Sequence, residues 1–203
     1  MHRYEVATIT IPVGATSRLL PKIGDYLAAG ANGKLCACWY SDIGALNQIM
    51  VIREFASDAE LIAERGRMAL AGNPFGIGEF VVDLAVDSFT PFPFLPPLAP
   101  GDAGPFYEVR AYTLRPSALA PMLEAWRAAI PARIKFSPLA IAMYAVEGAP
   151  RFMHAWPYQS LNERQRIRTA AVAAGVWPPK GGQDHLLTMR SSIFLAAPFS
   201  PLK

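Results

Sequence analysis

The sequence contains little of the chemistry on which metal and cofactor sites are usually built. It has two cysteines and three histidines in 203 residues, and it has no glycine-rich phosphate loop. A zinc site needs a Cys-x-x-Cys pair or a cluster of histidines. A three-histidine site here would have to bring His2 to His154 and His185. We therefore expect no metal ion and no cofactor, and no serine–histidine–acid set has a recognisable spacing.

Long apolar runs and dense blocks of one charge are also missing. The longest uncharged stretch, residues 88–101, is broken by prolines at 91, 93, 96, 97 and 100, so the sequence predicts no membrane span. The N-terminus has no basic segment followed by an apolar one, which argues against a signal peptide. The net charge is +3, and the densest basic segment is residues 164–168. We expect no nucleic-acid binding, because that function favours a clustered basic patch.

The two cysteines, Cys36 and Cys38, stand one residue apart in an apolar run that is typical of a strand. Side chains at i and i+2 of a strand share a face, but they are badly placed to bond to each other. We expect buried free thiols, which favours a reducing, cytoplasmic location.

The sequence does contain enough apolar material for a packed core, since 52% of its residues are apolar and 17% are charged. In the second half, aromatic and β-branched runs alternate with segments of helical apolar spacing. Pro121 is expected in the first turn of a helix that Pro131 closes, with Trp126 in the core. Ser160 and Glu163 form a capping box for the next helix. The predicted strands are residues 106–114, 140–147, 152–156 and 186–195, and the predicted helices are residues 119–130 and 161–174.

The first half repeats this order at a constant offset. Tyr4-Glu5-Val6 recurs as Tyr107-Glu108-Val109, and Gly72 recurs as Gly175, both 103 residues later. The ending Pro93-Phe94-Leu95-Pro96 matches Pro198-Phe199-Ser200-Pro201, 105 residues later. The predicted strands of this half are residues 4–11, 35–43, 49–55 and 79–89, and its predicted helices are residues 19–29 and 58–71. We infer an internal duplication.

The duplication divides the chain into repeat 1 at residues 1–98, a proline-rich linker at residues 99–105 and repeat 2 at residues 106–203. Each repeat has the order β-α-β-β-α-β, which is the ferredoxin-like arrangement. We expect an α+β fold in which two ferredoxin-like units pack sheet to sheet and close a barrel, as a pseudo-dimer within one chain.

Several motifs of the second half carry a family resemblance. They are Tyr107-Glu108-Val109-Arg110-x-Tyr112-Thr113-Leu114, Ser137-Pro138-Leu139, His154-Ala155-Trp156-Pro157-Tyr158-x-Ser160-Leu161-x-Glu163-Arg164 and Pro198-Phe199-Ser200-Pro201. With them, this half resembles the NIPSNAP family. The first half departs from the pattern, because Val51 stands where His154 stands and Arg53 where Trp156 stands.

The resemblance implies a dimeric α/β-barrel fold, and with it we expect a homo-oligomer. The superfamily of this barrel includes cofactor-independent monooxygenases and small-molecule-binding proteins. The family has no settled common reaction, so the resemblance implies the fold more than the function.

One predicted strand places Phe152, His154, Trp156 and Tyr158 on a single face. His154 could transfer a proton or bind a ligand, because small shifts move the pKa of histidine across neutral pH. The alternative, which we favour, is a core histidine that is hydrogen-bonded to a strand neighbour.

Arginines are the other candidates. Arg110 shares a strand face with Tyr112 and Glu108, and it could grip a ligand carboxylate or form a salt bridge with Glu108 or Glu147, which we favour. Arg164 and Arg168 lie one helical turn apart. They could line the mouth of an anion pocket or form a solvated helix face, and we favour the solvated face.

Three functions fit these residues. The preferred function is binding of a small molecule or a partner through the barrel pocket, and the altered motif of the first half predicts one working site per chain. The alternatives are a cofactor-independent monooxygenase or isomerase, and a structural module that oligomerises through sheet edges. The candidate ligand-binding residues are Arg110, Tyr112, His154, Trp156, Tyr158 and Arg164, and an enzyme would use His154, Tyr144, Tyr112 and Arg110 inside an aromatic-lined cavity.

Overall fold

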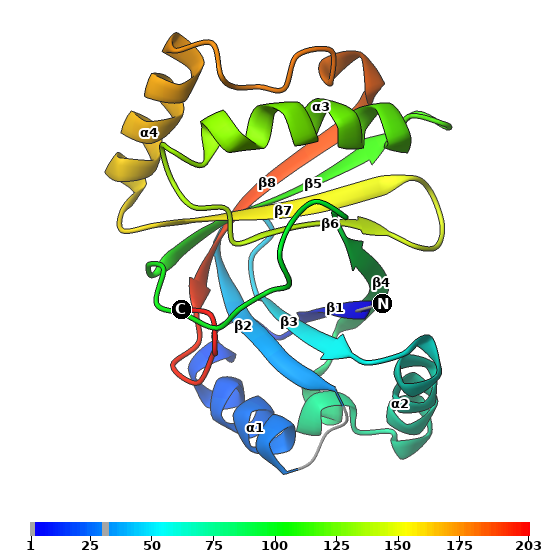
Figure 1. Ribbon diagram of the computed structural model, residues 1–203. Coiled ribbons are helices and arrows are strands. Elements are labelled where there is room, and N and C mark those ends of the chain that lie inside the picture. Colours follow the sequence, from blue (N-terminus) through cyan, green and yellow to red (C-terminus); the bar gives the residue numbers. More distant parts are fainter. Residues whose placement is uncertain (1–2, 30–32) are drawn as a thin grey trace.

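The computed structural model describes residues 3–29 and 33–203, which form an eight-strand antiparallel barrel with four α-helices on its outside (Figure 1). The first half contains β1 (Arg3–Thr10), α1 (Thr16–Ala28), β2 (Lys34–Ile43), β3 (Gln48–Phe55), α2 (Asp58–Ala71), the 3-10 turns η1 (Pro74–Gly76) and η2 (Gly78–Phe80), and β4 (Asp83–Pro91). The second half contains β5 (Phe106–Leu114), α3 (Leu119–Arg133), β6 (Ile141–Ala145), β7 (Arg151–Tyr158), α4 (Leu161–Ala173), the 3-10 turn η3 (Gln183–His185) and β8 (Leu186–Ala196).

The order β-α-β-β-α-β therefore occurs twice along the chain. The strands follow each other around the barrel as β1-β3-β2-β8-β5-β7-β6-β4. The two halves meet edge to edge, because β2 is hydrogen-bonded to β8 and β4 to β6. A closed barrel leaves no unpaired strand edge, so these two pairs replace the sheet edges that each half would otherwise expose.

Three groups of apolar side chains stabilise the fold. The first fills the barrel interior with residues of both halves, such as Trp39, Tyr107 and Phe194. The second lies between the first-half strands and α1, and the third lies between the second-half strands and α3, around Trp126 and Phe152. Figure 1 shows α3 and α4 over the strands of the second half and α1 and α2 over those of the first. Apolar layers thus lie on both the inner and the outer side of the barrel wall, although β8 is exposed on its outer face at Leu187 and Met189.

The helix starts agree closely with the sequence pattern. Ser57 and Ser160 cap α2 and α4, and each hydroxyl accepts from the backbone N–H of the glutamate three residues on. The return bond differs from the expected capping box, because Glu163 Oε2 accepts from Gln159 N, one residue before the cap. Pro131 does not close α3, which continues to Arg133. The buried face formed by Trp126, Ile130 and Arg133 outweighs the lost backbone hydrogen bond.

The last segment of each half crosses to the other half. Phe94, after β4, lies near Phe92 and beneath the guanidinium of Arg127 on α3, whose Cζ is 5.1 Å from the ring centroid. Phe199, after β8, packs against Gly24 of α1. Residues of the expected linker are held by the C-terminal tail, since Gly101 forms a β-bridge with Leu202.

The two cysteines are buried free thiols, as expected, but they do not share a face. A register shift between Leu35 and Ala37 interrupts the alternation of β2. Cys36 therefore packs with the barrel interior and Cys38 with the layer under α1. Burial raises the pKa of each thiol to about 12, so neither thiol is reactive at neutral pH.

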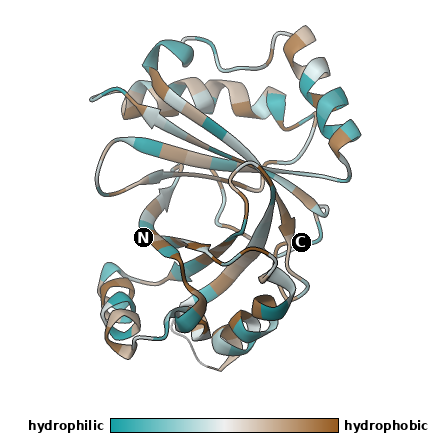
Figure 2. Cartoon of the chain, turned by 180° about the vertical axis from the view of Figure 1, so that it is seen from behind, coloured by the Kyte–Doolittle hydropathy of each residue, from teal (hydrophilic) through white to brown (hydrophobic). Residues whose placement is uncertain are grey.

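Hydrophilic and hydrophobic residues are mixed along the helices (Figure 2). None of the helices within residues 3–29 and 33–203 is both long and apolar enough to cross a bilayer.

Candidate functional site

The candidate residues of β5 and β7 lie on the outer face of the barrel wall, beneath α3 and α4. Tyr107 and Met153 point into the barrel, and the alternation of strand side chains places their neighbours Arg110, Tyr112 and His154 on the other side. The expectation that these residues line a pocket inside the barrel is therefore wrong. The sequence pattern identified the shared face correctly, but both faces of β7 are apolar and so do not indicate which one is enclosed.

Glu108, fully buried on this outer face, is surrounded by three arginines. It accepts from Arg110 Nε at 3.0 Å, from Arg164 Nη2 at 2.5 Å and from Arg168 Nη1 at 3.3 Å. The Ser191 hydroxyl on β8 adds a fourth hydrogen bond at 3.0 Å. We call these five residues the Glu108 cluster. It joins two neighbouring strands to α4.

The ionised form of Glu108 is strongly favoured. Burial acts to raise the pKa of this carboxyl, but the hydrogen bond from Arg164 and the charges of Arg110 and Arg168 outweigh burial and bring the pKa to about 2. Of the two alternatives for Arg110, the structure shows the salt bridge to Glu108. Arg164 and Arg168 do not form a purely solvated face, because both reach the same carboxylate.

Positive charge exceeds negative charge at this site. Three guanidinium groups share one carboxylate in the Glu108 cluster, and a further arginine, Arg133, lies buried nearby. Arg133 donates to Ser137 Oγ at 2.9 Å and to the Tyr158 hydroxyl at 3.5 Å, and its Cζ stands 4.1 Å from the Trp156 ring centroid. Among the described residues it has no carboxylate partner, and burial lowers its pKa. The region therefore carries more positive than negative charge.

A cavity of about 510 Å³ opens beside the Glu108 cluster. We call it the outer cavity. Arg110 and Arg168 supply its charged wall and Tyr112 a hydroxyl. The rest of the lining is mainly apolar and aromatic. It comes mostly from α3, β7, β8 and the loop between α4 and β8, and it includes Trp126, Phe152, Trp177, Leu187 and Met189. One side of the cavity is thus cationic and the other is suited to an apolar body.

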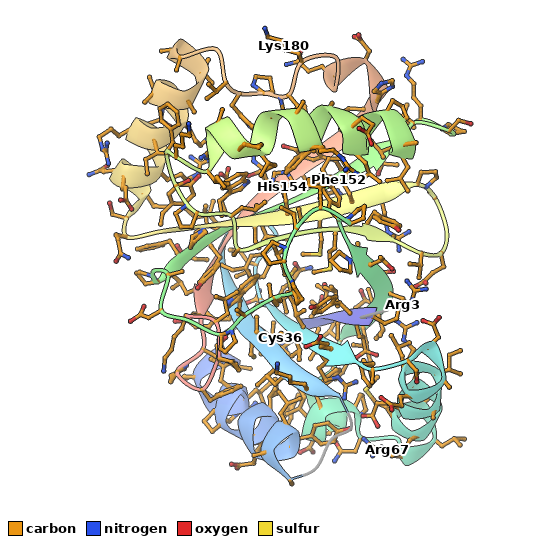
Figure 3. The ribbon with its side chains drawn as sticks, viewed as in Figure 1. Arg3, Cys36, Arg67, Phe152, His154 and Lys180 are labelled. Carbon is orange, nitrogen blue, oxygen red and sulfur yellow. The ribbon has the colours of Figure 1, made fainter. Side chains whose placement is uncertain are left out.

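His154 lies behind the wall of this cavity. Figure 3 shows it with Phe152 between β7 and α3. Its ring centroid is 5.1 Å from that of Tyr112 and 4.7 Å from that of Trp126, both of which line the cavity. Its Nδ1 accepts from Trp156 Nε1 at 2.8 Å, which leaves the proton on Nε2, a buried atom without a partner in the described structure. This is the strand-neighbour hydrogen bond that we favoured.

Burial, reinforced by the charge of Arg110, lowers the pKa of His154 well below its ordinary value of 6.5. The native state then keeps this ring neutral, whereas the unfolded chain binds a proton below pH 6.5. Stability should therefore fall as the pH drops below 6.5. The expected loss from this residue is about 2 kcal/mol between pH 7.5 and pH 5. Urea unfolding at the two pH values measures it.

His154→Phe is expected to remove that part of the pH dependence, and His185→Gln, which changes a partly exposed histidine, is expected to leave it in place. A wild-type protein with the same pH dependence as His154→Phe would show that His154 is charged in the native state.

The remaining candidates divide into those near the cavity and one that is apart. Trp156 and Tyr158 are buried in the layer that contains Arg133 and Trp177. Tyr144 on β6 is paired with Phe152, not with His154, and it is not part of the cavity lining. Of the four residues suggested for an enzyme, His154, Tyr144, Tyr112 and Arg110, only Tyr112 and Arg110 line the outer cavity.

No pattern in the sequence marked Trp177, Leu187 and Met189 as lining a cavity. The first belongs to a loop without periodicity, and the other two lie on a strand whose outer face no helix covers, with exposures of 55% for Leu187 and 63% for Met189. Among residues 3–29 and 33–203, no three His, Cys, Asp or Glu side chains are grouped to hold a metal ion. His2, considered above for a three-histidine site, lies outside the described residues.

Comparison with known proteins gives a family and a fold. Residues 107–201 match the NIPSNAP family model, while no curated protein matches the sequence significantly. A protein of Lactobacillus acidophilus described as a candidate monooxygenase is 7% identical, with a TM-score of 0.70 over 96% of this chain and 93% of that chain. A second protein described as a candidate monooxygenase, from Fusobacterium nucleatum, is 7% identical, with a TM-score of 0.65 over 96% of this chain and 92% of that chain. An anthrone oxidase-like protein is 10% identical, with a TM-score of 0.65 over 97% and 91%. These likenesses establish a shared fold.

Proposed function

The chain carries a NIPSNAP domain at residues 107–201, and we propose that this domain binds a small amphipathic anion in the outer cavity. The observation that carries the proposal is the excess of guanidinium groups over carboxylates in the Glu108 cluster, at the edge of an otherwise apolar cavity. The ligand class is a carboxylate or sulfonate with an aromatic or branched apolar body.

The chemistry follows from the lining. Arg168 holds Glu108 through one nitrogen at 3.3 Å, so its planar fork keeps further donors for a ligand anion. The Tyr112 hydroxyl accepts from Arg110 and can donate its own proton to the same anion. Trp126 and Trp177 meet edge to face at a centroid distance of 5.0 Å and provide flat apolar surface for the ligand body.

Arg168→Gln is expected to weaken binding of anilinonaphthalene sulfonate at least tenfold, because a charge-assisted hydrogen bond in a partly buried site contributes about 1.4 kcal/mol or more. Fluorescence titration measures the affinity. N-phenylnaphthylamine has the same ring system without the sulfonate, so its affinity should not change.

Arg166→Gln is the matched control, since Arg166 is an exposed arginine on the same helix and does not line the cavity. The proposal fails if Arg168→Gln and Arg166→Gln bind the sulfonate equally, or if the neutral probe loses as much affinity as the anionic one.

Two further features belong to this proposal. Residues 1–98 and 106–203 would be two ferredoxin-like copies joined by residues 99–105, as the repeated element order and the crossed endings of the halves support. The counterparts of His154 and Trp156 are Val51 and Arg53, so the anion site would occur once per chain. We also propose a cytoplasmic homo-oligomer, supported by the protonated thiols and by the exposed Leu187 and Met189.

Binding is preferred to catalysis because the polar groups at the cavity serve as donors to an anion. Arg110, Arg168 and Tyr112 form its polar wall, and the neutral His154 is separated from it by aromatic rings. The barrel resemblance to candidate monooxygenases concerns the fold alone.

A further inference from the structure

The inward-facing side chains of the barrel are large at one end and small at the other. Trp39 and Tyr107 stack with ring centroids 4.3 Å apart and help to fill one end. Towards the other end, inward positions carry short side chains, among them Ala85, Ala111 and Thr113. An eight-strand barrel is only just wide enough for side chains to fill it, so short side chains leave space. The result is a cavity of about 540 Å³ at this end, which we call the mouth cavity.

The mouth cavity and the outer cavity lie on opposite sides of the barrel wall, and Tyr112 and Phe152 belong to the lining of both. The mouth cavity lies on the inner face of β5, where Val109, Ala111 and Thr113 contribute, while Arg110 of the outer cavity points to the opposite face. Its floor is apolar, with Met153 as one member, and its walls carry hydroxyls and charged groups from both halves of the chain.

The charged side chains of the lining form one ion pair and leave two opposite charges without a partner. Arg151 Nη2 and Asp87 Oδ1 are 2.8 Å apart and neutralise each other. Asp83 on β4 and Arg190 on β8 also line the cavity, and neither has an ion-pair or hydrogen-bond partner within the described part of the chain. The strand order places β4 and β8 four strands apart in both directions around the barrel, so they form opposite walls. The mouth thus presents a carboxylate on one wall and a guanidinium on the other.

We propose that the mouth cavity is a second ligand site, which takes a small zwitterion with its ammonium group towards Asp83 and its carboxylate towards Arg190. A guanidinium and a carboxylate form a strong charge-assisted pair, and the apolar floor suits a methylene chain between the two charges. The Thr113 hydroxyl, on β5 next to β8, accepts from Thr188 Oγ1 at 3.0 Å and keeps its own proton to donate to the carboxylate. This site does not depend on the anion site proposed above.

Isothermal titration calorimetry with simple probes tests the proposal. The probes are ω-aminobutanoate, ω-aminohexanoate and ω-aminooctanoate, each compared with the alkanoate and the alkylamine of the same length. At least one amino acid is expected to bind tenfold more tightly than both of its singly charged counterparts. Equal affinities within every set would overturn the proposal.

Variants locate the binding. Arg190→Gln should reduce the amino acid's affinity to that of the alkylamine, whereas Arg115→Gln, at an exposed arginine outside the cavity, should have no effect. Ala111→Phe should fill the cavity and abolish binding, with the melting temperature as the check on folding. Arg190→Gln changes an exposed side chain, so it decides the matter even if Ala111→Phe is unstable. Full binding by Arg190→Gln would refute the site, and Arg168→Gln should leave it unaffected.

Discussion

Glu108→Gln is expected to lower the free energy of unfolding by about 3 to 5 kcal/mol, because removing one partner of a buried ionic group leaves the others uncompensated. Glutamine has nearly the same shape, so the loss reports on charge rather than on packing. Arg110, Arg164 and Arg168 would then lie close together without their shared carboxylate. Denaturant unfolding at neutral pH measures the change.

The pH dependence gives an independent estimate of the same effect. The pKa of Glu108 falls from an ordinary 4.5 to about 2 in the folded chain. A carboxyl with a lowered pKa stabilises the native state above its unfolded pKa, and that stability is lost as the pH falls from 4.5 towards 2. The contribution is about 3 kcal/mol at neutral pH. Wild type should show this loss in acid, and Glu108→Gln should not.

Glu124→Gln is the control, since Glu124 is an exposed glutamate whose nearest cation, Arg127 Nε, is 3.6 Å away at the surface. Its change should stay within about 1 kcal/mol. If Glu108→Gln were no more destabilising than Glu124→Gln, the arginines would be held apart by water or counter-ions, and the positive excess proposed for the anion site would be absent.

Local patterns predicted most of the fold because each element carries its own signals. The serine caps of α2 and α4, the glycine ends and the constant offset between the halves are all visible in the sequence. The same patterns do not predict on which side of the barrel wall a residue lies. Phe152 and Trp156 face the helices, while Met153 and Ala155 face the interior, and both sets are apolar. Alternation therefore predicts which residues share a face, not which face encloses a cavity.

The candidate site was only partly predictable for a related reason. Glu108 and Arg110 could be proposed as partners, because an arginine on a covered sheet face needs a carboxylate, whereas Arg168 was expected on a solvated helix face. Glu108 and Arg168 are 60 residues apart along the chain, so only the tertiary packing of α4 on the sheet brings them into contact. Trp177 stands in the loop before β8, where no periodicity indicates its position. The β-bulge that separates the faces of Cys36 and Cys38 is likewise set by pairing with β3, which local sequence does not describe.

Arg53→Met is expected to destabilise the protein by about 3 to 5 kcal/mol, for the reason that applies to Glu108 with the charges exchanged. Arg53 is fully buried between two buried glutamates, with Nη2 at 2.5 Å from Glu5 Oε1 and Nη1 at 2.8 Å from Glu64 Oε1. Methionine fills a similar volume but leaves both carboxylates without their central cation. Lys34→Met, which removes an exposed cation 3.7 Å from Glu54 Oε2, should change stability by less than about 1 kcal/mol.

The same variant tests why one half would bind an anion and the other would not. Around Arg53, Arg65 holds Glu5 at 3.3 Å and reaches Glu147 at 3.8 Å, and Arg67 holds Glu64 at 2.7 Å, so that three carboxylates serve three arginines. The buried Phe75 packs at 5.3 Å from the Arg53 guanidinium, where it helps to fill the space beneath α2. Arg53→Met should therefore leave the affinity for anilinonaphthalene sulfonate unchanged while the protein is folded. A loss as large as that of Arg168→Gln would mean that both halves bind the probe, and the difference in charge balance would then not determine where an anion binds.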